Sequence, residues 1–394
     1  MTVSPRRFNP VNSRFRALGA VLLSFCLFIG IARSAQELPT YLSDEVFWKL
    51  VTEFSEEGGY FLSDNFVSNE RMFQHVLSDL TLDREPGGAY LGVGPEQNFT
   101  YIVALKPKIA FIFDIRRQNM IQHLMYKVVF ELSADRAEFL SLLFSRPKPS
   151  NLSSDAGIVE LFDAFRDVAP DAAAYRANLA AIENRLTQDH GFTLSPEDEE
   201  NLDHVYGAFY LHGPTLAYSR SNRPGIMPSF EELMTEVDQH GDHRSYLATE
   251  ENYASLRELQ ANNLVIPLVG DFAGSTAIRA VGDYLKEHNT RVAAFYTSNV
   301  EQYLFRSDNN WKRFYTNVAA LPLEGRSVFI RAMVKTRGGQ FSAVPIIRPG
   351  SYLENGLYPI SDLVSAFELN MIRNYYDILY GQNLPDVLND QIPQ

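Results

Sequence analysis

Short apolar runs alternate with segments of helical periodicity over much of this chain. The apolar runs predict β-strands at 89–93, 109–113, 264–271, 291–296, 327–332 and 341–347. The periodic segments between them predict helices at 96–105, 119–132 and 275–287. Strands that alternate with helices indicate a mainly parallel sheet with helices on both faces. The expected fold class is therefore α/β, a doubly wound, Rossmann-like sheet.

Two long stretches carry a helical pattern without strands, and they set the expected domain boundaries. Ser195-Pro196 is a strong helix start, and Ser229 with Glu232 forms the sequence pattern of a capping box. The expected divisions are an N-terminal helical segment at 36–88, the first part of the Rossmann-like domain at 89–132, an inserted helical cap at 133–253, and the second part of that domain with a C-terminal tail at 254–394.

The first 35 residues have the pattern of a secretory leader. Four arginines precede an apolar stretch at 17–32, and Arg33-Ser34-Ala35 follows it. We therefore expect a signal peptide at 1–35, with an uncleaved membrane anchor as the alternative. The protein is expected to be exported, periplasmic or secreted, and to meet a membrane only through this segment.

Composition narrows the classes of partner. The chain has 394 residues, 45% of them hydrophobic, which is enough to bury a large core. Its formal net charge is −13, and no basic run follows the N-terminus, so a nucleic-acid partner is not expected. The single cysteine, Cys26, lies in the leader, which leaves no cysteine chemistry for the folded part. A small-molecule ligand is the expected partner, and the oligomeric state stays open.

The candidate chemistry lies around the first two predicted strands. Gly92 and Gly94 follow the first strand and permit a sharp turn close to a ligand, with the next helix starting near Pro95. Asp114 ends the second strand, where a carboxylate can accept hydrogen bonds from a ribose diol. Arg116 and Arg117 follow and are interpreted as a solvated helix start, with binding of an acidic substrate group or pairing with Glu96 as alternatives.

This order of elements, over residues 89–347, resembles the class I S-adenosylmethionine-dependent methyltransferases. Gly92 and Gly94 match the glycine turn of that family, and Asp114 matches the acid after its second strand. Asp271 lies where the family often has an acid near the adenine amine. The resemblance implies S-adenosylmethionine as cofactor and these cofactor-binding residues: Gly92, Gly94, Glu96, Asn98, Asp114 and Asp271.

The same resemblance suggests residues for catalysis. Asn299 and Tyr303 follow the fourth predicted strand, where the family places substrate-facing side chains. They are also similar to a Ser-Asn motif of enzymes that transfer the aminocarboxypropyl group of this cofactor. The resemblance thus implies that Asn299 and Tyr303 orient an unknown small acceptor in a group transfer, a reaction that needs alignment more than a nucleophilic side chain.

A second hypothesis rests on departures from the family pattern. Tyr90 stands where the family usually has an acid, and Glu96 stands at its third glycine position. A carboxylate there would repel the carboxylate of the cofactor's methionine part. An exported protein would also be separated from a cofactor made in the cytoplasm. The alternative is an exported, non-catalytic binding or scaffolding protein that retains the fold without the cofactor.

A further polar cluster, His240-Gly241-Asp242-His243, has residue types that bind zinc. No regular spacing enforces ligand geometry in such a loop, so we interpret it as a polar turn and expect no metal site.

Overall fold

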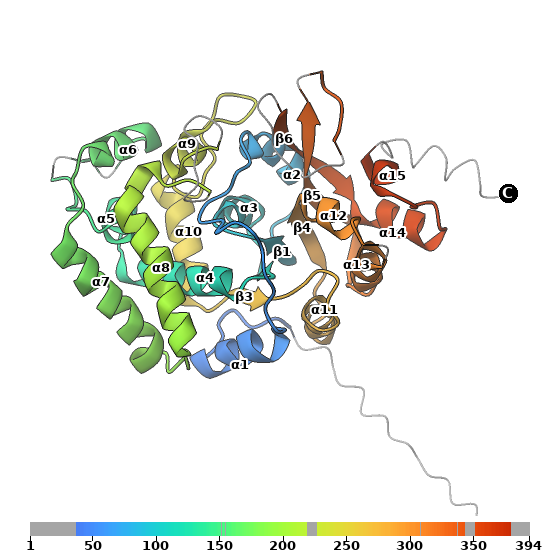
Figure 1. Cartoon of the computed structure of the whole chain (residues 1–394), viewed down its shortest axis with the longest axis horizontal. Coiled ribbons are helices and arrows are strands. Elements are labelled where there is room, and N and C mark those ends of the chain that lie inside the picture. Colours follow the sequence, from blue (N-terminus) through green and yellow to red (C-terminus); the bar gives the residue numbers. More distant parts are fainter. Residues whose placement is uncertain are drawn as a thin grey trace, which may run out of the picture. The chain divides into compact units, whose positions relative to one another are not determined.

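A six-stranded sheet forms the centre of the described part of the chain (Figure 1). The computed structural model describes residues 37–150, 152–153, 155–218, 227–307, 309–336, 338–342 and 351–379. The predicted leader lies outside these residues. The strands are β1 (Ala89–Val93), β2 (Ile109–Asp114), β3 (Val265–Val269), β4 (Val292–Ser298), β5 (Leu323–Thr336) and β6 (Ser351–Pro359). Their spatial order is β3-β2-β1-β4-β5-β6.

The sheet is mixed. β1 pairs in parallel with both β2 and β4, β2 pairs in parallel with β3, and β4 pairs in parallel with β5. β6 is antiparallel to β5, from Val328 opposite Pro359 to Thr336 opposite Ser351. The expectation of an α/β protein with a mainly parallel sheet is confirmed, and the reversed edge strand is an addition to it.

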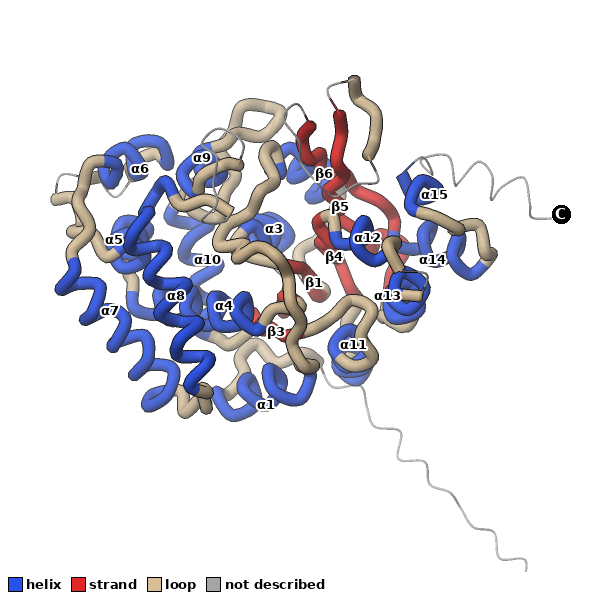
Figure 2. Tube along the Cα trace, in the orientation of Figure 1, coloured by secondary structure: helices blue, strands red, loops and turns tan. Residues whose placement is uncertain are grey.

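Helices cover the sheet on two sides. Their bounds are α1 (Asp44–Phe54), α2 (Leu77–Thr81), α3 (Gln97–Leu105), α4 (Arg117–Leu132), α5 (Arg136–Phe144), α6 (Ile158–Arg166), α7 (Ala172–Asn184), α8 (Pro196–His212), α9 (Phe230–Thr235), α10 (Glu250–Ala261), α11 (Ala277–Glu287), α12 (Val300–Leu304), α13 (Asn310–Ala319), α14 (Ile360–Glu368) and α15 (Tyr375–Leu379). In the view of Figure 2, α3, α4 and α10 lie on one side of the strands and α11, α13 and α14 on the other.

Aromatic side chains fill the core on both faces. The ring of Phe99 on α3 packs edge-on against Tyr126 on α4, with centroids 5.2 Å apart. On the opposite face, Phe314 of α13 lies 6.2 Å from Phe295 of β4, also edge-on. These buried rings attach the helices to the sheet, so the strand ends have fixed positions.

The helix starts predicted by capping patterns are confirmed. Ser195 caps α8 in a full capping box with Asp198, and Ser229 caps α9 in the same way with Glu232. Helices α5 to α9 lie between β2 and β3 in the chain.

Two local expectations are met only in part or lie outside the described residues. The N-terminal segment is helical at α1, at a 3-10 helix (Phe73–Val76) and at α2, but the stretch between α1 and the 3-10 helix is irregular. Its backbone groups bond to the sheet edge: Glu56 N–H donates to Val269 O, and Gly59 N–H donates to Ile115 O. The strand expected at 341–347 falls mostly on residues 343–350, outside the described residues, and β6 begins after it. β6 was not predicted, because Glu354, Asn355 and Gly356 in its middle interrupt any apolar run.

Candidate functional site

The predicted cofactor residues converge on one edge of the sheet. Here this edge is called the carboxyl edge, because the five parallel strands end there. Gly94 follows β1, Asp114 ends β2, Asp271 follows β3, and Asn299 follows β4. In doubly wound sheets this edge is where ligands bind, at the point where the strand order reverses.

The glycine turn is built as expected at Gly94. Its φ of +77° lies in the left-handed region that favours glycine, and its N–H donates to Phe113 O at 3.1 Å. The Nε2 atom of His123, on α4, lies 2.8 Å from the Gly94 carbonyl oxygen. Burial lowers the pKa of His123 to about 4, so the ring is neutral and Nε2–H donates to that carbonyl.

Gly92 is required for packing within the chain. A Cβ at this position would lie 1.8 Å from Asn98 Oδ1 and 2.8 Å from Tyr90 Cε1. Asn98 Oδ1 accepts a hydrogen bond from the Tyr90 hydroxyl at 2.9 Å. The Asn98 amide nitrogen donates to the carbonyls of Val93 and Pro95, at 2.9 and 2.7 Å. Asn98 therefore holds the turn together from inside, and all its polar atoms are used.

Glu96 is fully buried at the start of α3 and faces away from solvent. Its Oε1 accepts a hydrogen bond from Ser68 N–H at 3.2 Å, while Oε2 has no partner among the described residues. Burial raises the pKa of Glu96 from its ordinary value of 4.5 to about 8. The side chain is therefore mostly uncharged at neutral pH, which removes the repulsion that a carboxylate would exert on an anionic ligand.

Asp114, the predicted ribose ligand, is bound by Arg116. The Arg116 Nε and Nη2 atoms donate to the two carboxylate oxygens of Asp114 at 3.0 and 2.8 Å, and the Arg116 backbone N–H adds a bond of 2.9 Å. Both side chains are buried. Arg116 Nη1 also donates to the carbonyls of Ser63 and Asp64. The interpretation of Arg116 as a solvated helix start was therefore wrong, and so was its pairing with Glu96.

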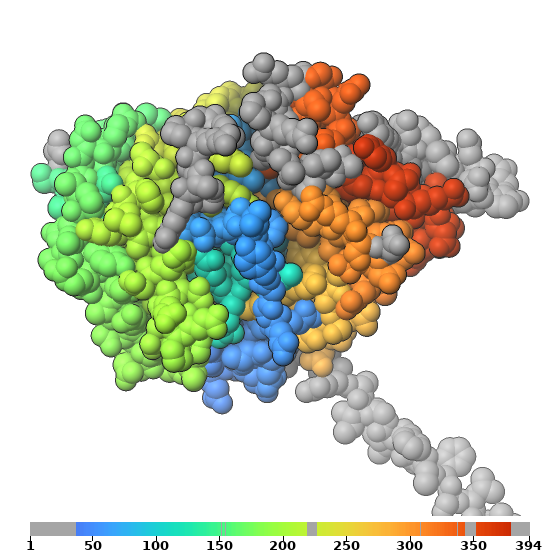
Figure 3. All heavy atoms as spheres, viewed as in Figure 1, coloured from blue at the N-terminus to red at the C-terminus, as the bar shows by residue number. Residues whose placement is uncertain are grey.

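Residues 55–70, called here the crossing segment, run across the carboxyl edge. They contact β3 through Glu56, β2 through Gly59, the start of α3 through Ser68, and β4 through Glu70. This order follows the strand order of the sheet. Figure 3 shows the segment in blue at the surface, between the helices drawn in green and the C-terminal half drawn in orange.

The part of the edge near Asp271 is occupied by Glu56. The Glu56 carboxylate accepts hydrogen bonds from the backbone N–H groups of Asp271, Thr276 and Ala277, the last two at the start of α11. A carboxylate is favourable at a helix N-terminus because the helix dipole is positive there. A Cβ at Gly274 would lie 2.0 Å from Glu56 Oε2, so this loop fits closely around the carboxylate. The Asp271 side chain accepts from Ala273 N–H and acts as a turn residue.

At the end of β4, a buried polar network surrounds Glu70. The Glu70 carboxylate is fully buried and accepts hydrogen bonds from both hydroxyl and amide groups. The donors are Tyr296 Oη at 2.8 Å, Ser298 Oγ, Gln97 Nε2 at 2.9 Å and Asn355 Nδ2 at 2.7 Å. Buried carboxylates are tolerated when several donors satisfy them. This network lies between β1 and β4, where the strand order reverses.

The two predicted catalytic residues follow β4 in the chain, and Asn299 comes directly after Ser298 of this network. Asn299 is the N-cap residue of α12, and its amide donates to Gln302 Oε1 at 3.1 Å. The Tyr303 ring packs edge-on against Phe61 of the crossing segment, with centroids 5.4 Å apart. The Arg306 guanidinium lies 5.1 Å from the centre of the Tyr303 ring. The crossing segment therefore covers Tyr303.

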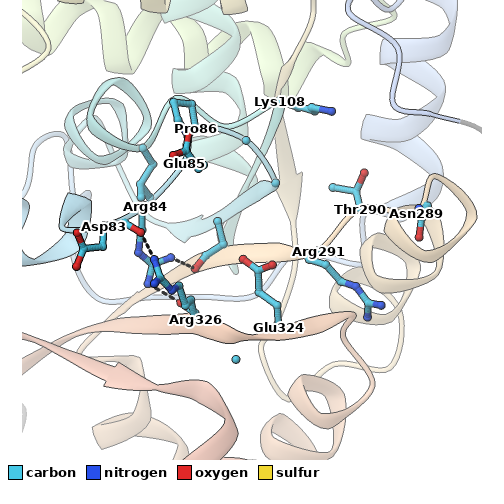
Figure 4. Close-up of a pocket in the computed structure, with 15 residues that line it drawn as sticks. Asp83, Arg84, Glu85, Pro86, Lys108, Asn289, Thr290, Arg291, Glu324 and Arg326 are labelled. Atoms are coloured by element: carbon cyan, nitrogen blue, oxygen red, sulfur yellow. Dashed lines mark hydrogen bonds between the residues drawn. The ribbon is translucent and has the colours of Figure 1, made fainter.

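A surface hollow lies at the opposite edge of the sheet, where β1, β4 and β5 begin. It has a volume of about 490 Å³ and is lined by charged side chains of both signs (Figure 4). Arg84 donates to the carbonyls of Ala293 and Arg326, so its guanidinium ties the loop before β1 to β4 and β5. This hollow contains none of the predicted site residues. A second hollow, of about 370 Å³, lies between α11 and α13.

In the described part of the chain, no three His, Cys, Asp or Glu side chains are grouped so as to hold a metal ion. Asp238 organises the loop that contains His240, because its Oδ1 accepts from the backbone N–H groups of His240 and Asp242. No described helix is long and apolar enough to span a bilayer.

Comparison with known proteins places the chain in a family. Residues 65–352 match the family described as Domain of unknown function (DUF7790). The match covers more than half of the chain, so the chain belongs to this family. It includes β1 to β5, the helices between them, and the glycine turn. Comparison with curated proteins gave no match.

Glu56 and Glu70 were not predicted from the sequence, and Arg116 was named there without its partner Asp114. Of the three, Glu56 contacts the predicted site residue Asp271 and Arg116 contacts Asp114. Glu56 and Glu70 lie in an irregular segment, where no periodicity identifies the buried positions. For Arg116 alone of these three, the sequence indicates the partner, because Arg116 lies two residues after the buried Asp114.

A glycine-to-alanine change tests the packing role of Gly92. The added Cβ would overlap Asn98 Oδ1 and force the Asn98 side chain out of the turn. We expect Gly92→Ala to lower the free energy of unfolding by about 1–3 kcal/mol, the usual cost of overpacking, as measured by urea unfolding. Gly325→Ala is the control, because a Cβ there meets nothing within 4 Å. Equal stability of the two variants would contradict the packing role.

The buried Glu96 predicts a pH dependence of stability. Since the pKa of Glu96 in the folded chain is about 8, above its ordinary 4.5, the folded chain keeps a proton that the unfolded chain releases between these values. Stability from this group therefore falls as pH rises through that window, by up to about 1.4 kcal/mol per pH unit. Glu96→Gln, which stays neutral, should become increasingly more stable than the wild type from pH 5 to pH 8.

Urea unfolding at several pH values measures this difference. Glu57→Gln, at an exposed neighbouring position, serves as the matched control and should show no such trend. If the stability of Glu96→Gln runs parallel to that of the wild type across this range, Glu96 is not held in its neutral form.

Proposed function

We propose that this protein is a non-catalytic binding protein built on a methyltransferase-like, Rossmann-like fold whose cofactor crevice is filled by its own crossing segment. The strand order β3-β2-β1-β4-β5-β6 supports such a fold, because it is the order of doubly wound nucleotide-binding sheets, here with the last strand reversed. The glycine turn after β1 and the acid at the end of β2 support the same assignment.

The observation that carries the proposal is the bidentate pair of Arg116 and Asp114. A ribose diol needs an accessible carboxylate oxygen. Asp114 is only 5% exposed, its Oδ1 already accepts two hydrogen bonds, and its Oδ2 accepts one from Arg116. The same guanidinium bonds to the carbonyls of Ser63 and Asp64, which fixes the crossing segment in place. A ligand at Asp114 would have to displace a buried ion pair and a segment of backbone together.

Two further contacts support a filled crevice. Glu56 takes the backbone N–H groups around Asp271 that an adenine or other polar ligand would use. Glu70 takes the hydroxyl of Ser298 and the amide of Gln97 at the point where the strand order reverses. Glu56 and Glu70 thus accept hydrogen bonds from the donors of this edge, and Arg116 donates to its acceptor Asp114.

S-adenosylmethionine-dependent group transfer is the second candidate function. The observation that favours it is the convergence of Gly94, Asp114 and Asp271 on one edge, with open space where a Cβ of Gly94 would lie. In this case the crossing segment would leave the edge, Asp114 would bind the ribose, and Asn299 and Tyr303 would orient the acceptor.

Titration calorimetry with the full chain distinguishes the two candidates. We expect neither S-adenosylmethionine nor S-adenosylhomocysteine to bind the wild-type protein, because Asp114 is already paired. Arg116→Met frees Asp114 and removes the bonds to Ser63 and Asp64, and we expect no binding to this variant either, since Glu56 and Glu70 still hold the segment.

Saturable binding to the wild type would contradict the proposal. Binding to Arg116→Met alone would show that the crevice accepts the cofactor once opened, and would favour the transferase. Circular dichroism of both proteins verifies that the variant is folded.

Export is part of the proposal, because a protein outside the cytoplasm has no supply of this cofactor. We expect cell fractionation of the native host to find the mature protein outside the cytoplasm, with an N-terminus near Ala35 by mass spectrometry. A full-length protein in the cytoplasm would contradict export and would favour the transferase.

A further inference from the structure

The hollow between α11 and α13 concentrates positive charge on a chain of net charge −13. Arg279 on α11 and Lys312 and Arg313 on α13 line it, and no acidic residue does. All three side chains are exposed. Within the described residues, none of the three forms an ion pair with a carboxylate. Three unpaired cations in one hollow repel one another unless an anion lies among them.

Arg279 is held in position by a buried amide. Its Nε donates to Asn317 Oδ1 at 2.7 Å, and Asn317 is only 2% exposed. Asn317 Nδ2 in turn donates to the carbonyls of Phe272 and Gly274, at 3.0 and 2.8 Å. The guanidinium is therefore oriented before any ligand arrives, and its two Nη groups are left without a partner among described residues. A preorganised guanidinium fork matches two oxygens of a phosphate group.

The remaining wall supplies further donors. Lys312 lies 5.3 Å above the ring of Trp311, which restricts its ammonium group. The N-cap residue of α13, Asn309, also lines the hollow and makes no side-chain cap bond. Among the described residues, no side chain accepts from the first N–H groups of this ten-residue helix. Ser275 and Thr316 add hydroxyl groups.

An acidic side chain lies close to the hollow. The Glu56 carboxylate lies against Gly274, which lines the hollow, and it already accepts the first N–H groups of α11. The α11 terminus is therefore not the donor. The residues that line the hollow are positive or uncharged, and the donors that remain come from the side chains of α11 and from α13.

We propose that this hollow, lined by Arg279, Lys312 and Arg313, binds the phosphate group of a small phosphomonoester. Its volume of about 370 Å³ falls within the range of small-molecule sites. Arg279 and Arg313 form the charge-assisted hydrogen bonds to the phosphate oxygens, and Lys312 adds charge. The site lies outside the filled crevice, so it can bind whether or not the proposed function holds.

Titration calorimetry with inorganic phosphate and ribose 5-phosphate tests this site, with ribose as the uncharged control. We expect saturable binding of both phosphates, no binding of ribose, and weaker binding as salt is added. Arg279→Gln and Arg313→Gln should each weaken binding about tenfold or more, because each removes a charged donor. Both residues are exposed, so these variants should fold.

Arg373→Gln, at an exposed position outside the hollow, is the matched control and should bind like the wild type. Absence of saturable binding by the wild-type chain at millimolar phosphate would overturn the proposal. Equal binding by wild type, Arg279→Gln and Arg313→Gln would overturn it as well, since the phosphate would then lie elsewhere. Neither result depends on S-adenosylmethionine, so failure here is separate from failure of the proposed function.

Discussion

The buried pair between Arg116 and Asp114 joins the crossing segment to the carboxyl edge of the sheet. Asp114 ends a central strand, and Arg116 connects its carboxylate to the carbonyls of Ser63 and Asp64. A buried carboxylate or guanidinium alone costs several kcal/mol, and the two offset that cost only when they are paired with good geometry. Loss of either partner would leave an uncompensated charge under the crossing segment. The ion pair therefore attaches the middle of the crossing segment to the end of β2.

The other contacts of the crossing segment follow the same principle. Glu56 bonds to backbone N–H groups at the start of α11, and Glu70 bonds to four side chains near β4. In each case an acid from an irregular segment meets donors that belong to regular elements. An α/β sheet leaves such donors at its carboxyl edge, where ligands use them in many proteins. In this protein its own side chains use them.

The sequence predicts the regular parts of the fold well, and the irregular parts poorly. Apolar runs locate β1 to β4, and the glycine turn with its positive φ at Gly94 follows from residue type alone. The crossing segment has no periodicity, because its conformation depends on hydrogen bonds to strand ends far away in the chain. β6 was missed because Glu354 and Asn355 stand in its middle. The convergence of Gly94, Asp114 and Asp271 could be predicted from topology, but the occupation of that edge could not.

The bond from Asn355 to Glu70 joins residues 285 positions apart in the chain. Contacts of such long range form late, because the entropy of closing so large a loop is lost before the contact is gained. During synthesis, residues 55–70 leave the ribosome long before β4 and β6 exist to receive them. The acids of this segment therefore stay hydrated until nearly the entire polypeptide is available, and completion of the sheet edge becomes a final step of folding.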